Sequence, residues 1–218
     1  MRLIAASKLA ACIVGTIGLI WGVTALAQTK PAGGENTVTI KEVSKTQVTF
    51  DGHVSKFEYA DAARVTFANG HGTVEARAKA IDGFLYFAFE IPDLSPHQGD
   101  DIVIMLETAN ARGDAPEKTA TRAYVRRKSE NSRAHVGDGK KWADTYADWE
   151  YRSTAYATGW EVEARIPLKS LNIDAGKSAT LGLAFRIWDN EPQKNWNWPA
   201  GSDEKKPSGW GTLEVQVP

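Results

Sequence analysis

The feature that most constrains this chain is the alternation of apolar and polar side chains with a period of two. Residues 73–81 read TVEARAKAI, in which small apolar side chains alternate with charged ones. Residues 84–91 read FLYFAFEI and are apolar almost throughout. Asp82-Gly83, a pair that favours a tight hairpin turn, separates the two segments. Because period two is typical of a strand, we predict a β-hairpin whose second arm is a central strand.

Seven further segments have strand-like patterning. They are residues 37–43, 101–108, 122–128, 149–157, 159–166, 180–188 and 211–217. Residues 167–172 (PLKSLN) predict one helical turn, with proline at its first position. Nine strands at this spacing, without a long helical period, predict an all-β fold. We expect an antiparallel β-sandwich of immunoglobulin-like or jelly-roll-like type, in a single domain over residues 37–218.

The first 27 residues have the pattern of a secretory signal peptide. Arg2 and Lys8 precede an uncharged apolar run that ends at Ala25-Leu26-Ala27, a small-x-small sequence suited to signal peptidase. We predict cleavage after Ala27, a polar linker over residues 28–36, and a secreted or periplasmic protein free of the membrane. An uncleaved membrane anchor and a lipoprotein site at Cys12 are the alternatives.

Cleavage there also changes the chemistry that is available. The 218-residue chain has 26 basic and 27 acidic residues, a formal charge of -1, and one cysteine. Loss of Arg2, Lys8 and Cys12 leaves 24 basic and 27 acidic residues and no thiol. The predicted domain therefore has no disulfide, cysteine nucleophile or thiolate metal ligand. The charge balance also argues against broad nucleic-acid binding.

Motifs of the common enzyme classes are missing from the sequence. It contains no glycine-rich phosphate loop, no GxSxG and no HExxH. The carboxylates of Glu90, Asp93, Glu161 and Glu163 could supply a glycosidase acid pair. Glu161 and Glu163 share the polar face of one predicted strand, which favours a solvated or salt-bridged sheet surface. We expect a non-catalytic protein.

Tryptophan is the strongest functional signal, with eight in the chain. Trp160 alternates with apolar residues in one predicted strand, and Trp188 ends another, so we expect both in the core. Four others lie in polar stretches: Trp142, Trp149, Trp196 and Trp198. Exposed indole faces stack on sugar rings, and neighbouring polar side chains bind the hydroxyls. The polar candidates are Asn195, Asn197, Asp189, Lys194, Arg126 and Arg127; the alternative is that the four rings fold back and cap the sandwich.

An acidic turn gives a weaker metal signal. Asp93, Asp100 and Asp101 bracket the polar sequence DLSPHQGDD, and oxygen-rich loops suit Ca²⁺. We expect these three residues as the metal ligands if a metal binds, with a solvated loop as the alternative. The four histidines are scattered and do not have metal-ligand spacing.

Several stretches resemble one known family. They are 50–52 (FDG), 57–60 (FEYA), 159–167 (GWEVEARIP), 181–189 (LGLAFRIWD) and 210–213 (WGTL). Together they make the chain similar to family 9 carbohydrate-binding modules and their relatives in the DOMON-like group. The resemblance implies a sugar-binding β-sandwich, often joined to polysaccharide-degrading enzymes such as a partner glycoside hydrolase, and often carrying Ca²⁺.

The same resemblance implies a terminal sugar clamped between two aromatic rings. His97 or Gln98 takes the place of the first ring, and Val103 or Ile104 stands where an acidic residue is usual. The loop 201–206, the source of the second ring, has no aromatic residue unless Trp196 or Trp198 turns into it. His97 would then form one wall.

These observations rank four functions. The first is a non-catalytic carbohydrate-binding protein, accessory to polysaccharide degradation, with contacts from Trp196, Trp198, Asn195, Trp142, His97, Arg126 and Asp189. The second is a haem-binding electron-transfer module using Met105, whose alternative is a core side chain. The third is a glycoside hydrolase, and the fourth is a cell-envelope interaction module that has lost its ligand.

Overall fold

The predicted hairpin is the centre of the observed five-stranded sheet. A computed structural model describes residues 36–41, 44–95, 97–128, 132–143, 147–174 and 176–216. Strand β3 (Thr73–Ile81) pairs antiparallel with β4 (Phe84–Pro92). Asp82 and Gly83 turn the chain with φ of 51° and 79°, the left-handed conformation that this type of hairpin requires.

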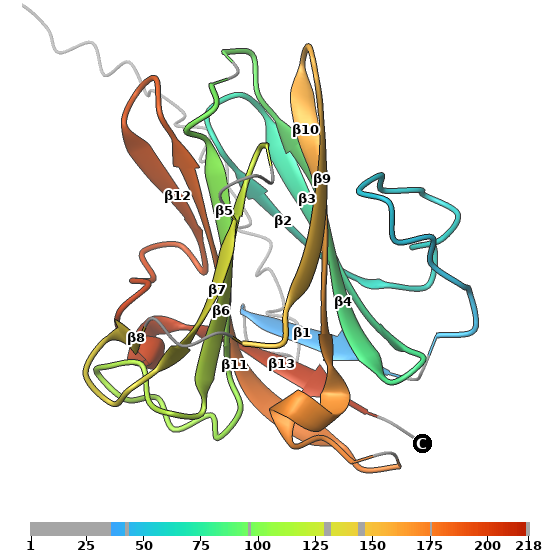
Figure 1. Cartoon of the computed structure of the whole chain (residues 1–218), viewed down its shortest axis with the longest axis vertical. Coiled ribbons are helices and arrows are strands. Elements are labelled where there is room, and N and C mark those ends of the chain that lie inside the picture. Colours follow the sequence, from blue (N-terminus) through green and yellow to red (C-terminus); the bar gives the residue numbers. More distant parts are fainter. Residues whose placement is uncertain are drawn as a thin grey trace, which may run out of the picture. The chain divides into compact units, whose positions relative to one another are not determined.

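Two sheets face each other and form a sandwich (Figure 1). The smaller has the order β2-β3-β4-β10-β9, with β2 at Ala63–Ala68, β10 at Gly159–Pro167 and β9 at Glu150–Tyr156. The larger has the order β1-β13-β11-β5-β6-β7-β8, and β12 pairs with β11 beside β13. Its strands are β1 (Thr37–Ile40), β13 (Gly211–Val215), β11 (Ala179–Asp189), β5 (Asp101–Glu107), β6 (Ala120–Arg126), β7 (Arg133–Gly137), β8 (Trp142–Ala143) and β12 (Lys194–Trp198).

The main core lies between the facing sheets. Phe87 and Phe89 of β4 meet Phe185 of β11, with ring centroids 6.0 and 5.0 Å apart in edge-to-face geometry. Trp160 lies in the same cluster and is 1% exposed. Alternate residues of each strand supply this core, as period two requires.

The predicted all-β sandwich is confirmed, and all nine predicted strands are present with ends shifted by a few residues. The predicted helical turn is the 3₁₀ helix η2 (Leu168–Leu171), and a second, η3, spans Pro207–Gly209. Four strands were missed: β2, β7, β8 and β12. One strand pair in the antiparallel sandwich is parallel, that of β1 with β13.

All described residues belong to one compact unit, which spans Gly33–Pro218. The predicted signal peptide and nearly all of the predicted linker lie outside the described residues. None of the described residues forms a helix long and apolar enough to cross a membrane.

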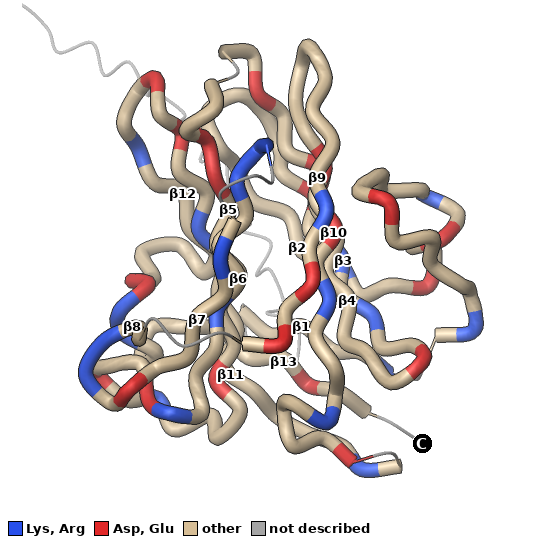
Figure 2. Tube along the Cα trace, viewed as in Figure 1, with Lys and Arg blue, Asp and Glu red and all other residues tan. Residues whose placement is uncertain are grey.

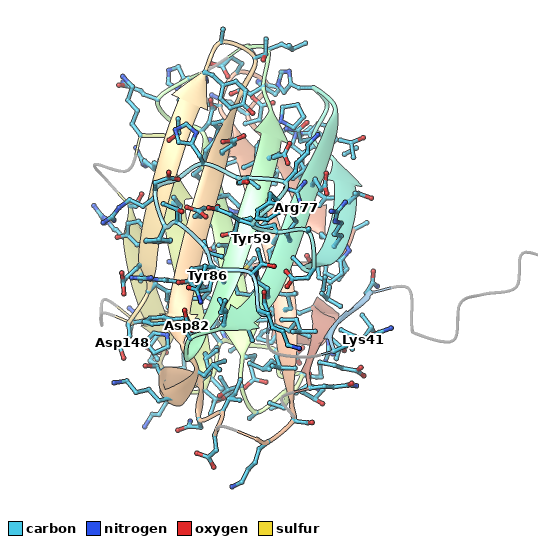
Figure 3. The ribbon with its side chains drawn as sticks, turned by 90° about the vertical axis from the view of Figure 1, so that its right-hand side faces the viewer. Lys41, Tyr59, Arg77, Asp82, Tyr86 and Asp148 are labelled. Atoms are coloured by element: carbon cyan, nitrogen blue, oxygen red, sulfur yellow. The ribbon has the colours of Figure 1, made fainter. Side chains whose placement is uncertain are left out.

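The outward side of the five-stranded sheet is covered by the segment 44–62 (Figure 3). Glu163 of β10 is fully buried there and accepts hydrogen bonds from the Tyr59 hydroxyl (2.6 Å) and the amides of Asp51 (2.9 Å) and Gly52 (2.8 Å). Burial raises the pKa of Glu163, although the three hydrogen bonds oppose it. Burial and the nearby Glu163 raise the pKa of Tyr59, so its hydroxyl remains a donor.

The sequence predicted a solvated or salt-bridged face for Glu161 and Glu163, and the structure shows that the segment 44–62 covers this face and that Glu163 is buried under it. Glu161 accepts a hydrogen bond from the Val54 amide (3.1 Å) and lies 3.3 Å from His53 Nδ1. Both carboxylates hold the covering segment in place.

Replacing Glu163 with alanine tests this anchoring. The change leaves two buried donors and the partly buried Asp51 amide without an acceptor, so we expect the free energy of unfolding to fall by about 3 kcal/mol. Urea denaturation measures the loss. Asp174→Ala is the matched control, because Asp174 is exposed and pairs only at the surface with Lys177. A Glu163→Ala protein as stable as the control would contradict the role assigned to this carboxylate.

Candidate ligand-binding face

The tryptophans of the described residues divide into six that pack in clusters and one that does not. Trp149, Trp160, Trp196 and Trp198 belong to or pack on the main core, and Trp142 and Trp210 form part of a smaller cluster outside the large sheet. Trp188 is half-buried and packs on none of the three hydrophobic clusters found among these residues. Trp188 is thus an indole whose partly exposed surface is not taken up by a hydrophobic cluster.

Trp196 and Trp198 do not lie on a polar loop, as the sequence suggested. Both are on β12, where the register pairs Trp196 with Ile187 and Trp198 with Phe185, so they face the core. Trp198 is 7% exposed, and its ring lies 5.4 Å from that of Phe185. Trp196 is half-buried, with Lys194 Nζ 3.8 Å from the ring centre and Gly70 against its edge. Neither offers an open ring face in this conformation.

The other two tryptophans proposed for stacking are also engaged. Trp149 is 6% exposed, and its Nε1 donates to Thr121 (2.9 Å). Trp142 of β8 stacks on Trp210 with centroids 6.3 Å apart, and Arg122 lies over it at 4.8 Å. Trp149 packs in the core between the sheets, and Trp142 packs on the cluster outside the large sheet. This matches the alternative given by the sequence, in which the rings fold back and cap the sandwich.

The interpretation of Trp188 as a core residue is wrong, and the strand pleat gives the reason. Phe185, Ile187 and Asp189 of β11 are buried on the inner side. Arg186 and Trp188 occupy the alternate positions and therefore point away from the other sheet.

Register assembles a polar surface around Trp188. Its neighbours across the sheet are Asp101 on β5 and Asn195 on β12. Beyond Asp101 comes Arg126 on β6, and one pleat further along lie Asn197, Arg186, Tyr124 and Arg133. We call this set the outer face: Asp101, Tyr124, Arg126, Arg133, Arg186, Trp188, Asn195 and Asn197. Figure 2 shows the basic positions that follow β6 and β7 along it.

Asp101 holds the middle of the outer face. Its Oδ1 accepts from Arg186 Nη2 (2.7 Å), and its Oδ2 accepts from the Tyr124 hydroxyl (2.6 Å). Burial raises the pKa of Asp101 to about 6, outweighing the opposite effect of Arg186 and Tyr124. Arg186 also lies 3.3 Å from Asn195 Oδ1. The contacts fix the side chains of a surface that combines an aromatic face with hydrogen-bonding groups, a combination suited to sugars.

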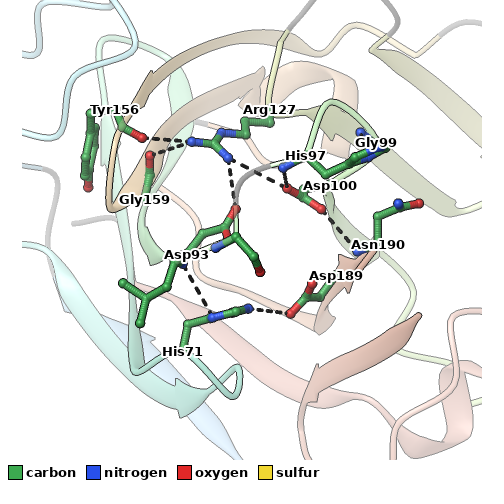
Figure 4. Close-up of polar contacts among 12 residues, drawn as sticks. His71, Asp93, His97, Gly99, Asp100, Arg127, Tyr156, Gly159, Asp189 and Asn190 are labelled. Atoms are coloured by element: carbon green, nitrogen blue, oxygen red, sulfur yellow. Dashed lines mark hydrogen bonds and ion pairs between the residues drawn. The ribbon is translucent and has the colours of Figure 1, made fainter. Parts of the chain in front are cut away.

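A buried ionic network lies just beyond the outer face and joins the two sheets (Figure 4). Arg127, 6% exposed, contacts Asp93 (3.1 Å) and lies 3.8 Å from Asp100. Its Nη2 also donates to the carbonyl oxygens of Tyr156 (2.8 Å) and Gly159 (3.3 Å). Burial raises the pKa of Asp100, although hydrogen bonds from the amides of His97 and Asn190 lower it.

A second cross-sheet contact completes the network. His71 Nε2 lies 2.7 Å from Asp189 Oδ2, linking the turn between β2 and β3 to the end of β11. Asp189, expected to contact sugar, is 6% exposed and faces the interior. It therefore helps to hold the ends of the strands that carry Asp101 and Trp188.

The three carboxylates proposed for Ca²⁺ do not converge. Asp93 and Asp100 both pair with Arg127, so their oxygens are directed at a guanidinium. Asp101 points to the outer face because it is the next residue along the strand. The set Asp93, Asp100 and Asp101 does not fit a calcium site. His97, Asp100 and Glu191 could bring ligand atoms within 4.8 Å of one another, but Asp100 already accepts from two amides.

The structure brings together only part of the predicted sugar site. Asn195 and Arg126 lie on the outer face, and His97 lies in the loop that leads into β5. Trp142 lies on the same side of the large sheet, in the cluster on which Tyr124 also packs, but its ring is stacked on Trp210. Trp196, Trp198 and Asp189 face the interior. Met105, the proposed haem ligand, is 1% exposed and packs in the cluster of Trp210, as its core interpretation predicted.

Trp188 and Asp101 could have been found from the sequence. In the segment 180–188 the apolar residues Leu181, Leu183, Phe185 and Ile187 are odd-numbered, so Trp188 shares the polar side with Arg186. The alternation in KNWNW likewise indicates a strand with its tryptophans on one side and its asparagines on the other. The alternation of odd and even positions along each strand is therefore the sequence signal that places these residues on the outer face.

Solved structures with the same fold are known. Two structures of a family 9 carbohydrate-binding module from Caldicellulosiruptor kristjanssonii match this chain, in complex with cellotriose and with glucose. Their TM-scores are 0.60 and 0.62 at 15% and 16% identity, and the matches cover 84% of this chain and 95% and 97% of theirs. No protein-family model matches the sequence, and no curated protein matches it. The chain thus has the fold of a family 9 carbohydrate-binding module, as its sequence indicated.

Replacing Arg127 with methionine tests the network. Two buried carboxylates would lose their partner, so we expect the free energy of unfolding at pH 7 to fall by about 3–5 kcal/mol. The pKa of Asp100 is raised in the folded protein, so its protonated form favours folding at low pH, and this contribution is lost as pH rises through the raised pKa. Without Arg127, the buried carboxylates are unpaired charges at pH 7 and are more fully protonated, and hence neutral, at pH 5. The variant should therefore lose less stability, relative to wild type, at pH 5 than at pH 7.

Urea denaturation at the two pH values measures the difference. Arg152→Met is the control, since Arg152 is an exposed residue of β9 in the five-stranded sheet, where it lies over the ring of Phe50 in the covering segment. An equal loss at both pH values would assign the effect of Arg127 to packing and not to its charge.

Proposed function

We propose that this protein binds carbohydrate on the outer face, with Trp188 as the stacking residue. The observation that carries the proposal is a half-buried indole outside every hydrophobic cluster of the described residues, flanked by Asp101 and Asn195. An indole in this position otherwise leaves apolar surface in water, which a stacked pyranose covers.

The polar groups around Trp188 suit the hydroxyls of a sugar. Asn195 carries an amide donor and acceptor, and the guanidinium groups of Arg186 and Arg126 are donors only. Asn197 is less available, because its amide nitrogen donates to the Ser202 carbonyl oxygen (2.7 Å) and its Oδ1 is buried. Because Asp101, Tyr124 and Arg186 are already bonded to one another, their positions are set before a ligand arrives. Preorganisation of this kind lowers the entropic cost of binding.

The fold gives independent support. The two similar structures hold cellotriose and glucose, which makes a neutral sugar a reasonable first ligand to test. The aromatic clamp implied by the family resemblance is not part of the proposal, because Trp196 and Trp198 are packed inward. His97, near the entrance to β5, remains a candidate for a contact at the edge of the ligand.

We also propose that residues 1–27 direct export and are cleaved after Ala27, and that the protein assists polysaccharide degradation outside the cytoplasm, with a glycoside hydrolase as partner. This part rests on the charged and apolar pattern of the N-terminal sequence and on the family resemblance.

Removal of Trp188 is the direct test of the site. A glycan array selects the ligand, and isothermal titration calorimetry with that oligosaccharide measures Kd. We expect Trp188→Ala to weaken binding by about 2 kcal/mol, or roughly 30-fold, because the stacking surface is lost. Phe57→Ala is the control: Phe57 is 80% exposed on the segment that covers the other sheet and should not affect Kd.

A Trp188→Ala protein with wild-type affinity would show that the site lies elsewhere. If Trp196→Ala or Trp198→Ala abolished binding while their thermal stability was unchanged, the inner side of β12 would open to take the ligand and the outer-face assignment would fail.

Export is tested on the secreted protein by intact-mass and N-terminal analysis. We expect the first residue to be Gln28, since the small residues at positions 25 and 27 suit signal peptidase. A mass that includes Met1, or a lipid attached at Cys12, would instead support one of the two alternatives given by the sequence.

A further inference from the structure

Arginine outnumbers carboxylate on the outer face. Arg126, Arg133 and Arg186 lie there with a single acid, Asp101. A second acid, Glu204, reaches Arg186 from the loop after β12, with Oε2 3.1 Å from Nε, and also pairs with Arg122. This local excess contrasts with the balanced charge of the whole chain, which is -1.

The oxygens of Asp101 and Glu204 are already taken by Arg186, Tyr124 and Arg122. Both oxygens of Asp101 already accept short hydrogen bonds, one from Arg186 and one from Tyr124. Glu204 divides its oxygens between Arg122 and Arg186. Neither acid is left to neutralise a further guanidinium.

Among the described residues, Arg126 and the exposed Arg133 are the arginines of the outer face that form no direct ion pair, and of the two only Arg126 is close enough to Asp101 to lower the pKa of that carboxyl. Among the residues that the structure describes, no acid lies within ion-pair distance of the Arg126 guanidinium, and its covered Nε has no hydrogen-bond acceptor. The group lies over the Tyr124 ring, 5.7 Å from the centroid. Stacking on an aromatic ring holds the planar fork in place while leaving its terminal nitrogens to bind a ligand.

The position of Arg126 relates it to the proposed sugar site. Trp188 and Arg126 flank Asp101 in the same register row, on strands to either side of β5. Their backbones are therefore about 10 Å apart, twice the spacing of neighbouring strands. A sugar ring on Trp188 would direct an exocyclic group across Asp101 toward Arg126.

We propose that the ligand is an acidic sugar, a uronic acid residue whose ring stacks on Trp188 and whose carboxylate pairs with Arg126. The proposal rests on the carbohydrate-binding function proposed above and names its substrate class. A guanidinium binds a planar carboxylate through two parallel hydrogen bonds, which provides both charge pairing and orientation. Arg186 neutralises Asp101, so the approaching carboxylate does not meet an uncompensated acid.

The experiment compares one backbone with and without its charge. Calorimetry measures the binding of trigalacturonate, its methyl ester and neutral cellotriose to the purified protein. We expect wild type to bind the acid at least tenfold more tightly than the ester. Arg126→Gln should reduce this ratio to about one, because it removes the charge pair with the acid and costs the ester at most one hydrogen bond, so that binding of the acid falls much further than binding of the ester. Arg152→Gln, an exposed arginine on the other sheet, should retain the full preference.

The outcomes separate this inference from the proposed function. Binding of acid and ester within twofold of each other, or an equal loss of both in Arg126→Gln, overturns the uronate assignment. If the protein binds cellotriose but neither trigalacturonate nor its methyl ester, the uronate assignment is overturned and the carbohydrate-binding function stands. Binding of none of these sugars, nor of any on the glycan array, removes both. A sulfated oligosaccharide without carboxylate groups that binds as tightly as trigalacturonate would also overturn the inference, because any negative charge would then be enough for binding.

Discussion

The pleat of β11 is the constraint on which the rest of this molecule depends. Adjacent residues on a strand must face opposite ways, so a strand that supplies Phe185 and Ile187 to the core must present Arg186 and Trp188 outside. The same rule turns Asp100 toward the buried network and Asp101 toward the outer face. On β12 it turns the tryptophans inward and the asparagines outward. Core, network and candidate site are thus successive consequences of one register.

The cross-sheet network explains how the end of the sandwich stays closed without a disulfide. Burying Arg127 with Asp93 and Asp100 costs desolvation, which only good hydrogen-bond geometry offsets. The bonds to Tyr156 and Gly159 provide that geometry and reach the opposite sheet. Such a network adds less stability than an apolar core of equal volume. Its more specific effect is to fix the loop before β5 and the end of β11, the two places from which Asp101 and Trp188 project.

The sequence predicted the fold well because alternation is a local signal. The hairpin at Asp82-Gly83 and the arm from Gly159 to Ile166 were found because each pattern is complete within ten residues. Strand β2 was missed, although its burial alternates, because it is short, lies at an edge and has a half-buried inner side. The candidate site was harder to predict, since polar surroundings in sequence do not reveal burial. Trp198 has asparagine and proline as neighbours, yet its register partner is Phe185, 13 residues away along the chain.

The inward tryptophans and the outward one have different physical roles, and the distinction bears on how the fold would be used. Trp198 and Trp149 fill the space between sheets that differ in strand number, and removing either would leave a cavity. Trp142 and Trp210 seal the part of the large sheet that lies beyond Arg122. Trp188 performs neither task, because it belongs to none of the hydrophobic clusters found among the described residues. The part of its indole that is exposed to water therefore does not contribute to the packing of these clusters. A ligand that covers the indole and also satisfies Arg126 would account for both features with a single site on a rigid sheet, where neither strand has to move for the ligand to bind.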